Sequence, residues 1–318
     1  MPARALGIVA LALLLAAAPF AAPWVKLFLI ITLAKGLAVL GVIVLLRAGQ
    51  VSFGHALFFC FAAYVIAFAG RSPGGGELLT LLLASTLGSA LLGLAVGLFV
   101  VRYRSIFFGM LNLAFSMVFF SILEKFTNLT GGSDGIRIRR PSLLGLVIER
   151  AAFEWVLYGL TAVLALVCAL FVNRYFASPP GEMLRAIKSN ETRLEYTGVS
   201  ARRVLLGGYV VSAALCGLGG GVTALVQGLA TPEFGFWTRS GELVFIAILG
   251  GSAHVAGAFV GAVIFEGLRN GAAIFFADVW QLILGVALLL IVIYAPEGVC
   301  GLIAKYWRRG DATQEGAP

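Results

Sequence analysis

Three titratable side chains stand inside strongly apolar stretches of the sequence: Lys35, His55 and His254. A lysine in the middle of a membrane-spanning helix costs about 3 kcal/mol or more if it faces lipid, so Lys35 is expected to face protein or water. It can then line a passage, or a neighbouring helix carbonyl can accept its hydrogen bonds. Each histidine follows a serine, in the runs SFGH and SAH, so an intramembrane serine–histidine hydrolase has to be considered.

The spacing of these serines and histidines argues against hydrolysis. Ser52 and His55 are three residues apart and could share a helix face, whereas Ser252 and His254 are two apart and could not. Neither pair is accompanied by a recognisable acid partner or oxyanion donor, which a nucleophilic serine needs. We therefore expect each histidine to be satisfied by a neighbouring helix or carbonyl, or to line a passage.

Three carboxylates lie in or beside the apolar stretches of the C-terminal third. Glu242 begins an apolar stretch that glycines interrupt, so it remains a candidate pathway residue. Glu266 and Asp278 are expected near membrane interfaces, where a carboxylate stays hydrated and has little cost.

The sequence contains no recognisable site for a nucleotide or a metal. It has no GxxxxGK[ST] phosphate loop and no Gly-Lys dipeptide, so it is not expected to cradle ATP. Its four cysteines are isolated in apolar stretches, without a Cys-x-x-Cys pair or a nearby His or carboxylate cluster: Cys60, Cys168, Cys216 and Cys300. We expect no cofactor and no metal in this chain, so that any energy for transport comes from a partner.

The composition is that of a protein whose solvent is largely lipid. Of its 318 residues, 60% are apolar and 12% charged, which leaves too little polar surface for a water-soluble globule. Eight apolar runs are long enough to cross a hydrocarbon core, which takes about 20 helical residues. They lie near residues 4–22, 25–46, 51–69, 78–101, 106–123, 152–172, 204–229 and 276–295. The sequence therefore predicts an all-α integral membrane protein, one domain over 1–318, with about eight full transmembrane helices.

A further apolar stretch, 242–268, is interrupted by Gly250-Gly251 and again by Gly257 and Gly261. This pattern predicts a broken or re-entrant pair of short segments. The 40 glycines of the chain cluster here and at 217–221, which favours close packing of helices. Residues 1–22 resemble a signal peptide, so they are either an uncleaved first span or a cleaved leader.

The basic residues predict the orientation in the membrane. If 242–268 returns to its own side, thirteen Lys and Arg residues lie at the inner ends and nine outside, whereas a single crossing gives eleven against eleven. The positive-inside rule favours the returning pair, with both termini in the cytoplasm and 124–151 outside. Topology thus explains the formal charge of +8, and the basic residues, which sit at span ends, do not indicate a nucleic-acid partner.

The longest predicted cytoplasmic segment, 173–203, contains a short helix with one apolar face. The run Ser178-Pro179-Pro180-Gly181 ends the preceding span, and GEMLRAIKSNETRLEYTGVS follows. Met183, Leu184 and Ile187 share a face, which lipid or a partner is expected to cover, and Gly198 is placed to stop a second short turn. The segment is either a connector on the membrane surface or a helix on which a partner docks.

Six blocks of sequence resemble the branched-chain amino acid ABC transporter permease family, in the family's order. They are GQVSFGHALFF at 49–59, FFGMLNLAF at 107–115, LTGGSDGI at 129–136, GEMLRAIKSNETRLEYTG at 181–198, YVVSAALCGLGGGVTAL at 209–225 and LGGSAHVAGAFVGA at 249–262. The resemblance is to the subunit type that carries the LTGGSDGI loop. The chain departs from the family at four places: the family usually has a Thr where Asn112 stands, an Asn near Val42, and a Gly and a Pro where Ala253 and Ala258 stand.

The resemblance implies roles for three sets of residues. The loop at about 178–200 is expected to couple to an ATPase through Gly181, Glu182, Leu184, Arg185, Ala186, Ile187, Glu191 and Gly198. Candidate pathway or gate residues are Ser52, Gly54, His55, Asn112, Glu242, Gly250 and Gly251. Candidates for contact at the outer face are Thr130, Gly131, Gly132, Asp134 and Gly135.

The resemblance also implies an assembly in the bacterial cytoplasmic membrane. Its other members are expected to be a second permease subunit, two cytoplasmic ATPase subunits that bind ATP and Mg, and a periplasmic solute-binding protein. The solute is a branched-chain amino acid, another amino acid, urea or an amide. The main alternative is an ion-coupled secondary transporter, which needs proton or sodium sites at membrane depth.

Overall fold

The computed structural model describes residues 23–71, 76–143, 145–146, 149–275, 280–294 and 298–302. Ten long or medium helices dominate this part of the chain, joined by short turns, two 3-10 turns and one small two-stranded sheet. The helices are α2 (Pro23–Arg47), α3 (His55–Ala69), α4 (Leu78–Val100), α5 (Ser105–Lys125), α7 (Arg150–Ala177), α8 (Pro179–Tyr196), α9 (Ala201–Gln227), α10 (Trp237–Gly250), α11 (Val255–Phe275) and α12 (Trp280–Tyr294). The smaller elements are α6 (Thr127–Thr130), η2 (Gly132–Asp134), β1 (Ile136–Arg137), β2 (Leu229–Ala230) and η3 (Pro232–Gly235).

The prediction of an all-α membrane protein is confirmed, but the count of eight full spans is not. Five helices of the described chain, α2, α4, α5, α7 and α9, are long and apolar enough to cross a membrane. One further predicted span, at 51–69, is a helix of only 15 residues, because α3 begins at His55. Of the predicted span at 276–295, the structure describes only the part in α12, and residues 276–279 and 295 lie outside the described residues. The predicted span at 4–22, with the question of its cleavage, lies outside the described residues.

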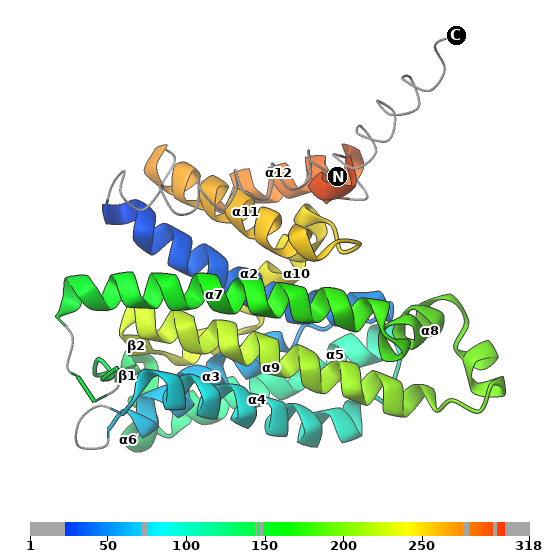
Figure 1. The fold of residues 1–318 in the computed structure, drawn as a ribbon, viewed down its shortest axis with the longest axis horizontal. Helices are drawn as coiled ribbons and strands as arrows, with labels where there is room; N and C mark the ends of the chain where they lie inside the picture. The colour runs from blue at the N-terminus through cyan, green and yellow to red at the C-terminus, as the bar shows by residue number, and fades with distance from the viewer. Residues whose placement is uncertain are drawn as a thin grey trace, which may run out of the picture.

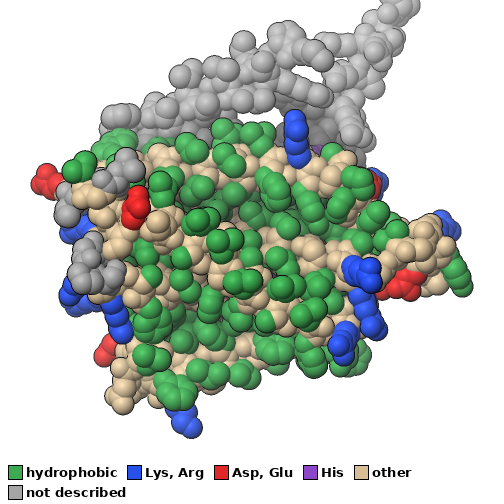
Figure 2. Space-filling model, turned by 60° about the horizontal axis from the view of Figure 1, so that its bottom comes forward, with side chains coloured by type: hydrophobic (Ala, Val, Ile, Leu, Met, Phe, Trp, Pro, Cys, Tyr) green, Lys and Arg blue, Asp and Glu red, His purple; other side chains and the backbone are tan. Residues whose placement is uncertain are grey.

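Helices α2 and α9 form the centre of the bundle, with α4, α5 and α7 around them (Figure 1). The apolar windows of α2 and α9 are 89% and 78% buried, whereas those of α5 and α7 are 28% buried. Leucines on the outward face of α4 are exposed, as expected for a helix that meets lipid: Leu83, Leu87, Leu91 and Leu98. Figure 2 shows one face of the molecule, on which a broad hydrophobic surface lies between two ends where charged residues gather.

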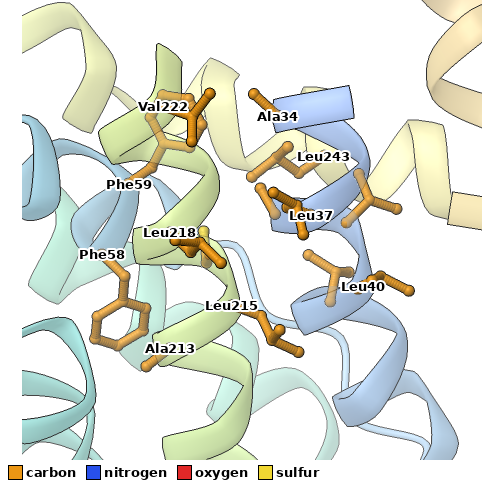
Figure 3. Packing of buried hydrophobic residues seen from close by; sticks show 14 of the residues in the cluster. Ala34, Leu37, Leu40, Phe58, Phe59, Ala213, Leu215, Leu218, Val222 and Leu243 are labelled. Carbon is orange, nitrogen blue, oxygen red and sulfur yellow. The ribbon is translucent and has the colours of Figure 1, made fainter. Parts of the chain in front are cut away.

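Glycines bring the central helices unusually close together, as the clustering at 217–221 predicted. A Cβ atom on Gly219 of α9 would lie 2.4 Å from the Ala34 carbonyl oxygen of α2, and one on Gly220 would lie 2.3 Å from that of Phe59 on α3. Figure 3 shows the result, with Leu218 and Val222 of α9 packed between α2 and α3. Any larger residue at these two glycines would force the backbones apart.

Helices α10 and α11 form the bent pair that the sequence predicted as a broken or re-entrant element, and we call it the re-entrant pair. They meet at a bend of 113° after Gly250, where Gly251 has a positive φ of 95°. The two arms touch through glycines, since a Cβ on Gly250 would lie 1.8 Å from the Gly257 carbonyl oxygen and one on Gly261 would lie 2.3 Å from that of Ile246. The interruption that the sequence predicted is therefore a tight helical hairpin inside the bundle.

The two ends of the molecule differ in structure (Figure 1). At one end, α8 extends beyond the ends of α7 and α9, and a hollow beside it is lined by Arg47, Arg185, Lys188 and Ser252. The bend of the re-entrant pair therefore lies at this end, which the charges predict to be cytoplasmic. At the opposite end, β1 and β2 pair antiparallel, with Ile136 opposite Ala230, and so join the loop at 124–151 to the end of α9.

Candidate functional site

A cluster of five charged residues lies at mid-depth in the bundle; we call it the Lys35 cluster. Lys35 stands twelve residues from either end of α2, so it lies about 18 Å from each end of that helix. Its ammonium donates hydrogen bonds to the carboxylates of Glu242 on α10 and Glu266 on α11. Arg239 donates to Glu242 at 2.7 Å, and Arg269 lies 3.6 Å from Glu242 and 3.8 Å from Glu266.

This cluster answers the question that the sequence left open for Lys35. The lysine faces protein, and its partners are carboxylates of the re-entrant pair rather than a helix carbonyl. The side chains of Lys35 and Glu266 are only 3% and 6% exposed, so both charges are largely removed from water. An ion pair in such surroundings holds three helices together and is costly to break.

The prediction that Glu266 lies near a membrane interface is wrong. It lies at the level of Lys35 because α10 and α11 run back along one another from the bend. The contacts of Gly250 with Gly257 and of Ile246 with Gly261 are one helical turn apart. One more turn along both arms brings Glu242 beside residues 265 and 266. The glycine spacing therefore contained the signal, once the broken element is taken as a hairpin.

Two of the nine basic residues assigned to the outside, Arg239 and Arg269, belong to the Lys35 cluster. The predicted outer face thus has seven of those nine residues, which widens the difference from the thirteen predicted inside. The positive-inside rule consequently favours the same orientation more strongly. Asp278, the other carboxylate expected at an interface, lies outside the described residues.

His55 pairs with a serine, but not with the one that the sequence offered. Its Nε2 lies 2.6 Å from Oγ of Ser212 on α9, while the Ser52 hydroxyl accepts a hydrogen bond from the Gly54 amide at 3.3 Å. The Ser212 hydroxyl donates its only proton to the Gly41 carbonyl at 2.6 Å. Nε2 must therefore be the donor in the pair, so that His55 cannot take a proton from Ser212. This geometry is that of a structural hydrogen bond and not of an activated nucleophile.

The candidate pathway residues fall into three places rather than one. Ser52, Gly54, His55 and Asn112 lie together, because a Cβ on Gly54 would be 2.3 Å from the Asn112 carbonyl oxygen. The Asn112 side chain accepts a hydrogen bond from Tyr209 and donates one to the Phe108 carbonyl at 2.8 Å. These side chains are fully packed inside the subunit.

The remaining pathway candidates lie on the re-entrant pair. Glu242 belongs to the Lys35 cluster, whereas Gly250 and Gly251 form the bend at the predicted cytoplasmic end. Glu242 also lines a cavity of the described chain. That cavity has a volume of about 610 Å³.

The predicted coupling segment forms α8, a helix that lies on the bundle through one face. Leu184 and Ile187 are buried, and Leu184 packs against Gly208 of α9, where a Cβ would lie 3.2 Å from it. The expectation that lipid or a partner covers these two residues is wrong, because α9 and its neighbours cover them. Gly181 fits tightly as well, since a Cβ there would be 2.2 Å from the Tyr175 carbonyl oxygen.

The outward face of α8 is charged and exposed. It carries Glu182, Arg185 and Lys188, while Ala186 is half-buried. Asn190 breaks the helix with an extended backbone, and its side chain accepts a hydrogen bond from the Arg193 amide at 2.9 Å, which caps a second short helical piece.

Glu191 and Gly198 fix the second piece of α8 in place. Glu191 accepts two hydrogen bonds from Arg104 at 2.7 and 2.8 Å, so the piece is tied to the residue before α5. Gly198 ends it with a positive φ of 84°, as its position after the run predicted. The segment is therefore an ordered platform at the end of the bundle.

The candidate outer residues form an ordered loop at the opposite end. The Thr130 hydroxyl donates to the Phe126 carbonyl at 2.8 Å, and Gly131 and Gly132 have positive φ angles. Gly135 approaches β2 closely, since a Cβ there would lie 2.3 Å from the Ala230 carbonyl oxygen. Asp134 is exposed at the surface of this loop.

Five long apolar helices, a re-entrant pair and a charge cluster buried at mid-depth define a multi-pass α-helical membrane protein. Residues 25–293 match the family described as "Branched-chain amino acid transport system / permease component". The chain therefore belongs to the branched-chain amino acid permease family.

Several curated proteins resemble the chain. The high-affinity branched-chain amino acid transport system permease protein LivM of Escherichia coli is 29% identical over 277 residues, covering 79% of this chain and 64% of that protein. The chain thus spans less than two thirds of the length of that relative. A probable LivM protein of Methanocaldococcus jannaschii is 25% identical over 69% of the chain and 68% of that protein.

A more local similarity involves the nucleoside ABC transporter permease protein NupB of Lactococcus lactis. It is 32% identical over 117 residues, which cover 35% of this chain and 30% of that protein. No solved structure matches the chain.

Proposed function

We propose that this chain is a membrane-spanning subunit of an ATP-driven importer for branched-chain or related amino acids, in a bacterial cytoplasmic membrane. It forms half of the translocation pathway with a second permease subunit. Two ATPase subunits bind ATP and Mg on the cytoplasmic side, and a periplasmic binding protein delivers the solute to the outer face. The similarity to LivM proteins supports the solute class and the partners.

The geometry of α8 carries this proposal. Leu184 and Ile187 hold the helix on the bundle, while Glu182, Arg185 and Lys188 face outward from the end of the molecule. A partner that moves α8 would therefore also move α9, on which Leu184 is seated. The hollow beside α8 includes Ser252 at the bend of the re-entrant pair, so the same movement would reach α10 and α11.

In the proposed cycle, closure of the ATPase subunits displaces α8 and the helices packed on it, and the bundle changes the side on which its pathway opens. This is a rigid-body transmission between two states of the assembly. The ordered loop around Asp134 faces the other side, where the solute-binding protein docks. The ATPase subunits thus bind at one end of the helical bundle and the solute-binding protein at the other, and the transmembrane helices connect these two ends.

A charge reversal on α8 tests the coupling role. Arg185 is exposed, and its ion pair with Glu182 in the same helix is long, at 3.9 Å, so Arg185→Glu should leave the fold intact. We expect this variant to reach the membrane but to lose ATPase binding in a pull-down, and with it ATP-driven uptake. The control for the pull-down is Arg137→Glu, which reverses an exposed charge at the opposite end, away from the ATPase subunits. Normal pull-down and uptake by Arg185→Glu would show that α8 is only a connector.

An ion-coupled carrier remains the second candidate, and one observation favours it. The sequence alone indicated only Lys35 and the histidines as titratable groups at membrane depth, and beside Lys35 lie the carboxylates of Glu242 and Glu266. A carrier of this kind would transport solute without an ATPase. The local similarity to a nucleoside permease also makes nucleosides a solute class to include in uptake assays.

A further inference from the structure

One side of the bundle is open at membrane depth, where the 610 Å³ cavity beside the Lys35 cluster lies. The residues that line this cavity come from α5, η3, α10, α11, α12 and the turn before α10. Thr238, Phe245 and Ile248 form an exposed row along α10, and the first two of them line the cavity. The row reaches from the first turn of α10 to its last, so the described chain leaves this helix uncovered along one side.

Polar and charged side chains reach this open side. Glu233, Thr238 and Gln281 line the cavity and are exposed, and 37% of the Arg269 side chain is exposed as well. Charged side chains at membrane depth face protein or a water-filled cavity, because exposure to hydrocarbon is costly. Lipid is therefore a poor cover for this side of the bundle, and the chemistry of the opening favours another protein chain.

Helix α5, which borders the cavity through Phe120, has an outward row of residues unlike that of α4. The exposed row on α4, at intervals of four, four, three and four residues, consists entirely of leucine: Leu83, Leu87, Leu91, Leu94 and Leu98. The same intervals on α5 give a row of exposed or half-buried residues that we call the α5 stripe: Ile106, Met110, Ala114, Met117 and Ser121. Small residues let helices approach closely, and methionine adapts its shape to a partner. The α4 row thus suits lipid, whereas the α5 stripe suits contact with another helix.

Two hollows lie along the α5 stripe. One of about 630 Å³, near the predicted cytoplasmic end, is lined by Ile106 and Met110 among others. The other, of about 340 Å³, lies near the outer end and is lined by Met117, Ser121 and Lys125 among others. Packed helices place the side chains of one between those of the other, so a surface hollowed in this way can receive a second helix.

We propose that the second permease subunit packs against the α5 stripe and the open side of α10, and that it closes the 610 Å³ cavity between the two chains. The solute pathway then runs along this boundary, beside the re-entrant pair. A second copy of this chain fits less well, because residues near a two-fold axis meet their own copies and Lys125 would face another Lys125. A different subunit can present a polar or acidic group there. This inference rests on the proposed transport function.

Photo-crosslinking from the two matched rows tests the interface. The full transporter would carry p-benzoylphenylalanine at one position at a time, in place of Met110 or Met117 on α5, or of Leu87 or Leu91 on α4. This chain and the second permease subunit carry different tags, and the membranes are irradiated before they are dissolved. We expect adducts with the second permease subunit from Met110 and Met117, and none from Leu87 or Leu91.

A bulky side chain in the same rows gives an independent measurement. Ala114→Trp should lower the amount of second permease subunit recovered with this chain by about tenfold or more, because the ring keeps the two helices apart. The control Leu91→Trp places the same ring in the α4 row and should leave the recovery unchanged. Size-exclusion chromatography of each variant reports whether the chain is folded. If Ala114→Trp does not fold, the crosslinks still decide.

Four results would overturn the interface. Adducts with the second permease subunit from the α4 positions alone would place the contact on α4, and adducts between two copies of this chain would replace the partner. No protein adduct from α5, in an assembly that contains the second permease subunit, would show that lipid covers the stripe. Unchanged recovery with folded Ala114→Trp would exclude close contact at the stripe. Each of these leaves the importer intact, whereas absence of a second permease subunit from the unaltered assembly would remove the proposed pairing itself.

Discussion

Replacing Lys35 by methionine should destabilise the protein more than replacing a lysine that is exposed on the surface of the protein. Methionine keeps the length and apolar packing of the side chain but leaves the carboxylates of Glu242 and Glu266 without their shared cation. Their side chains are 14% and 6% exposed, so water cannot replace the lost partner at Glu266. Removing one partner of a buried ion pair costs about 3–5 kcal/mol. The expected result is a large loss of thermal stability of the purified protein in detergent.

A compensating variant separates the charge effect from a packing effect. Lys35→Met combined with Glu266→Gln removes the lysine together with its more deeply buried carboxylate, while Glu242 keeps Arg239 and Arg269, so most of the lost stability should return. Melting can be followed by the temperature at which the monodisperse peak disappears in size-exclusion chromatography. The control is Lys125→Met, at an exposed position that ends α5. Wild-type stability in Lys35→Met, or no recovery in the double variant, would refute the assignment of this cluster as a stabilising ionic centre.

Three further predictions concern other parts of the bundle. Gly219→Leu should prevent stable assembly in the membrane, because the leucine side chain would meet the α2 backbone. Gly159→Ala, where a Cβ would have nothing within 4 Å, should instead stabilise the protein by roughly 0.5–1 kcal/mol. Expression level and melting temperature compare the two variants. Gly198→Val should reach the membrane but lower ATP-driven uptake, because a branched residue at a φ of 84° costs about 1–2 kcal/mol; uptake as in the wild type would exclude a role for this turn. Glu191→Gln should cost at most about 1 kcal/mol, since Arg104 and Glu191 are partly exposed; a melting shift as large as that of Lys35→Met would contradict this.

The long apolar runs and the spacing of the glycines were enough to predict most of the fold. The positions of α2, α4, α5, α7 and α9 follow from runs that cross a hydrocarbon core, and such runs have few alternatives in lipid. The glycine pairs at 250–251 and 257–261 predicted the re-entrant hairpin. The predicted span at 51–69 is shorter than expected, because α3 begins at His55 and its apolar residues are buried inside the protein, where length is not set by the bilayer.

The partners of buried polar groups could not be predicted in the same way. Lys35 was known to need a partner, but Glu266 lies 231 residues away and was assigned to an interface. His55 was compared with the serines near it in sequence, yet its partner is Ser212, 157 residues away on α9. Such contacts depend on which faces of the helices meet, and hydropathy carries little information about that.

The proposed importer function is tested most directly by measuring which source of energy drives uptake. The full set of subunits, including the solute-binding protein and the ATPases, would be reconstituted in proteoliposomes, and uptake of radiolabelled leucine measured from the side opposite α8. We expect uptake that requires ATP on the side of α8 and that continues without any proton or sodium gradient. Leucine uptake by this chain without ATPase subunits, driven by an ion gradient, would contradict the importer mechanism and establish the carrier.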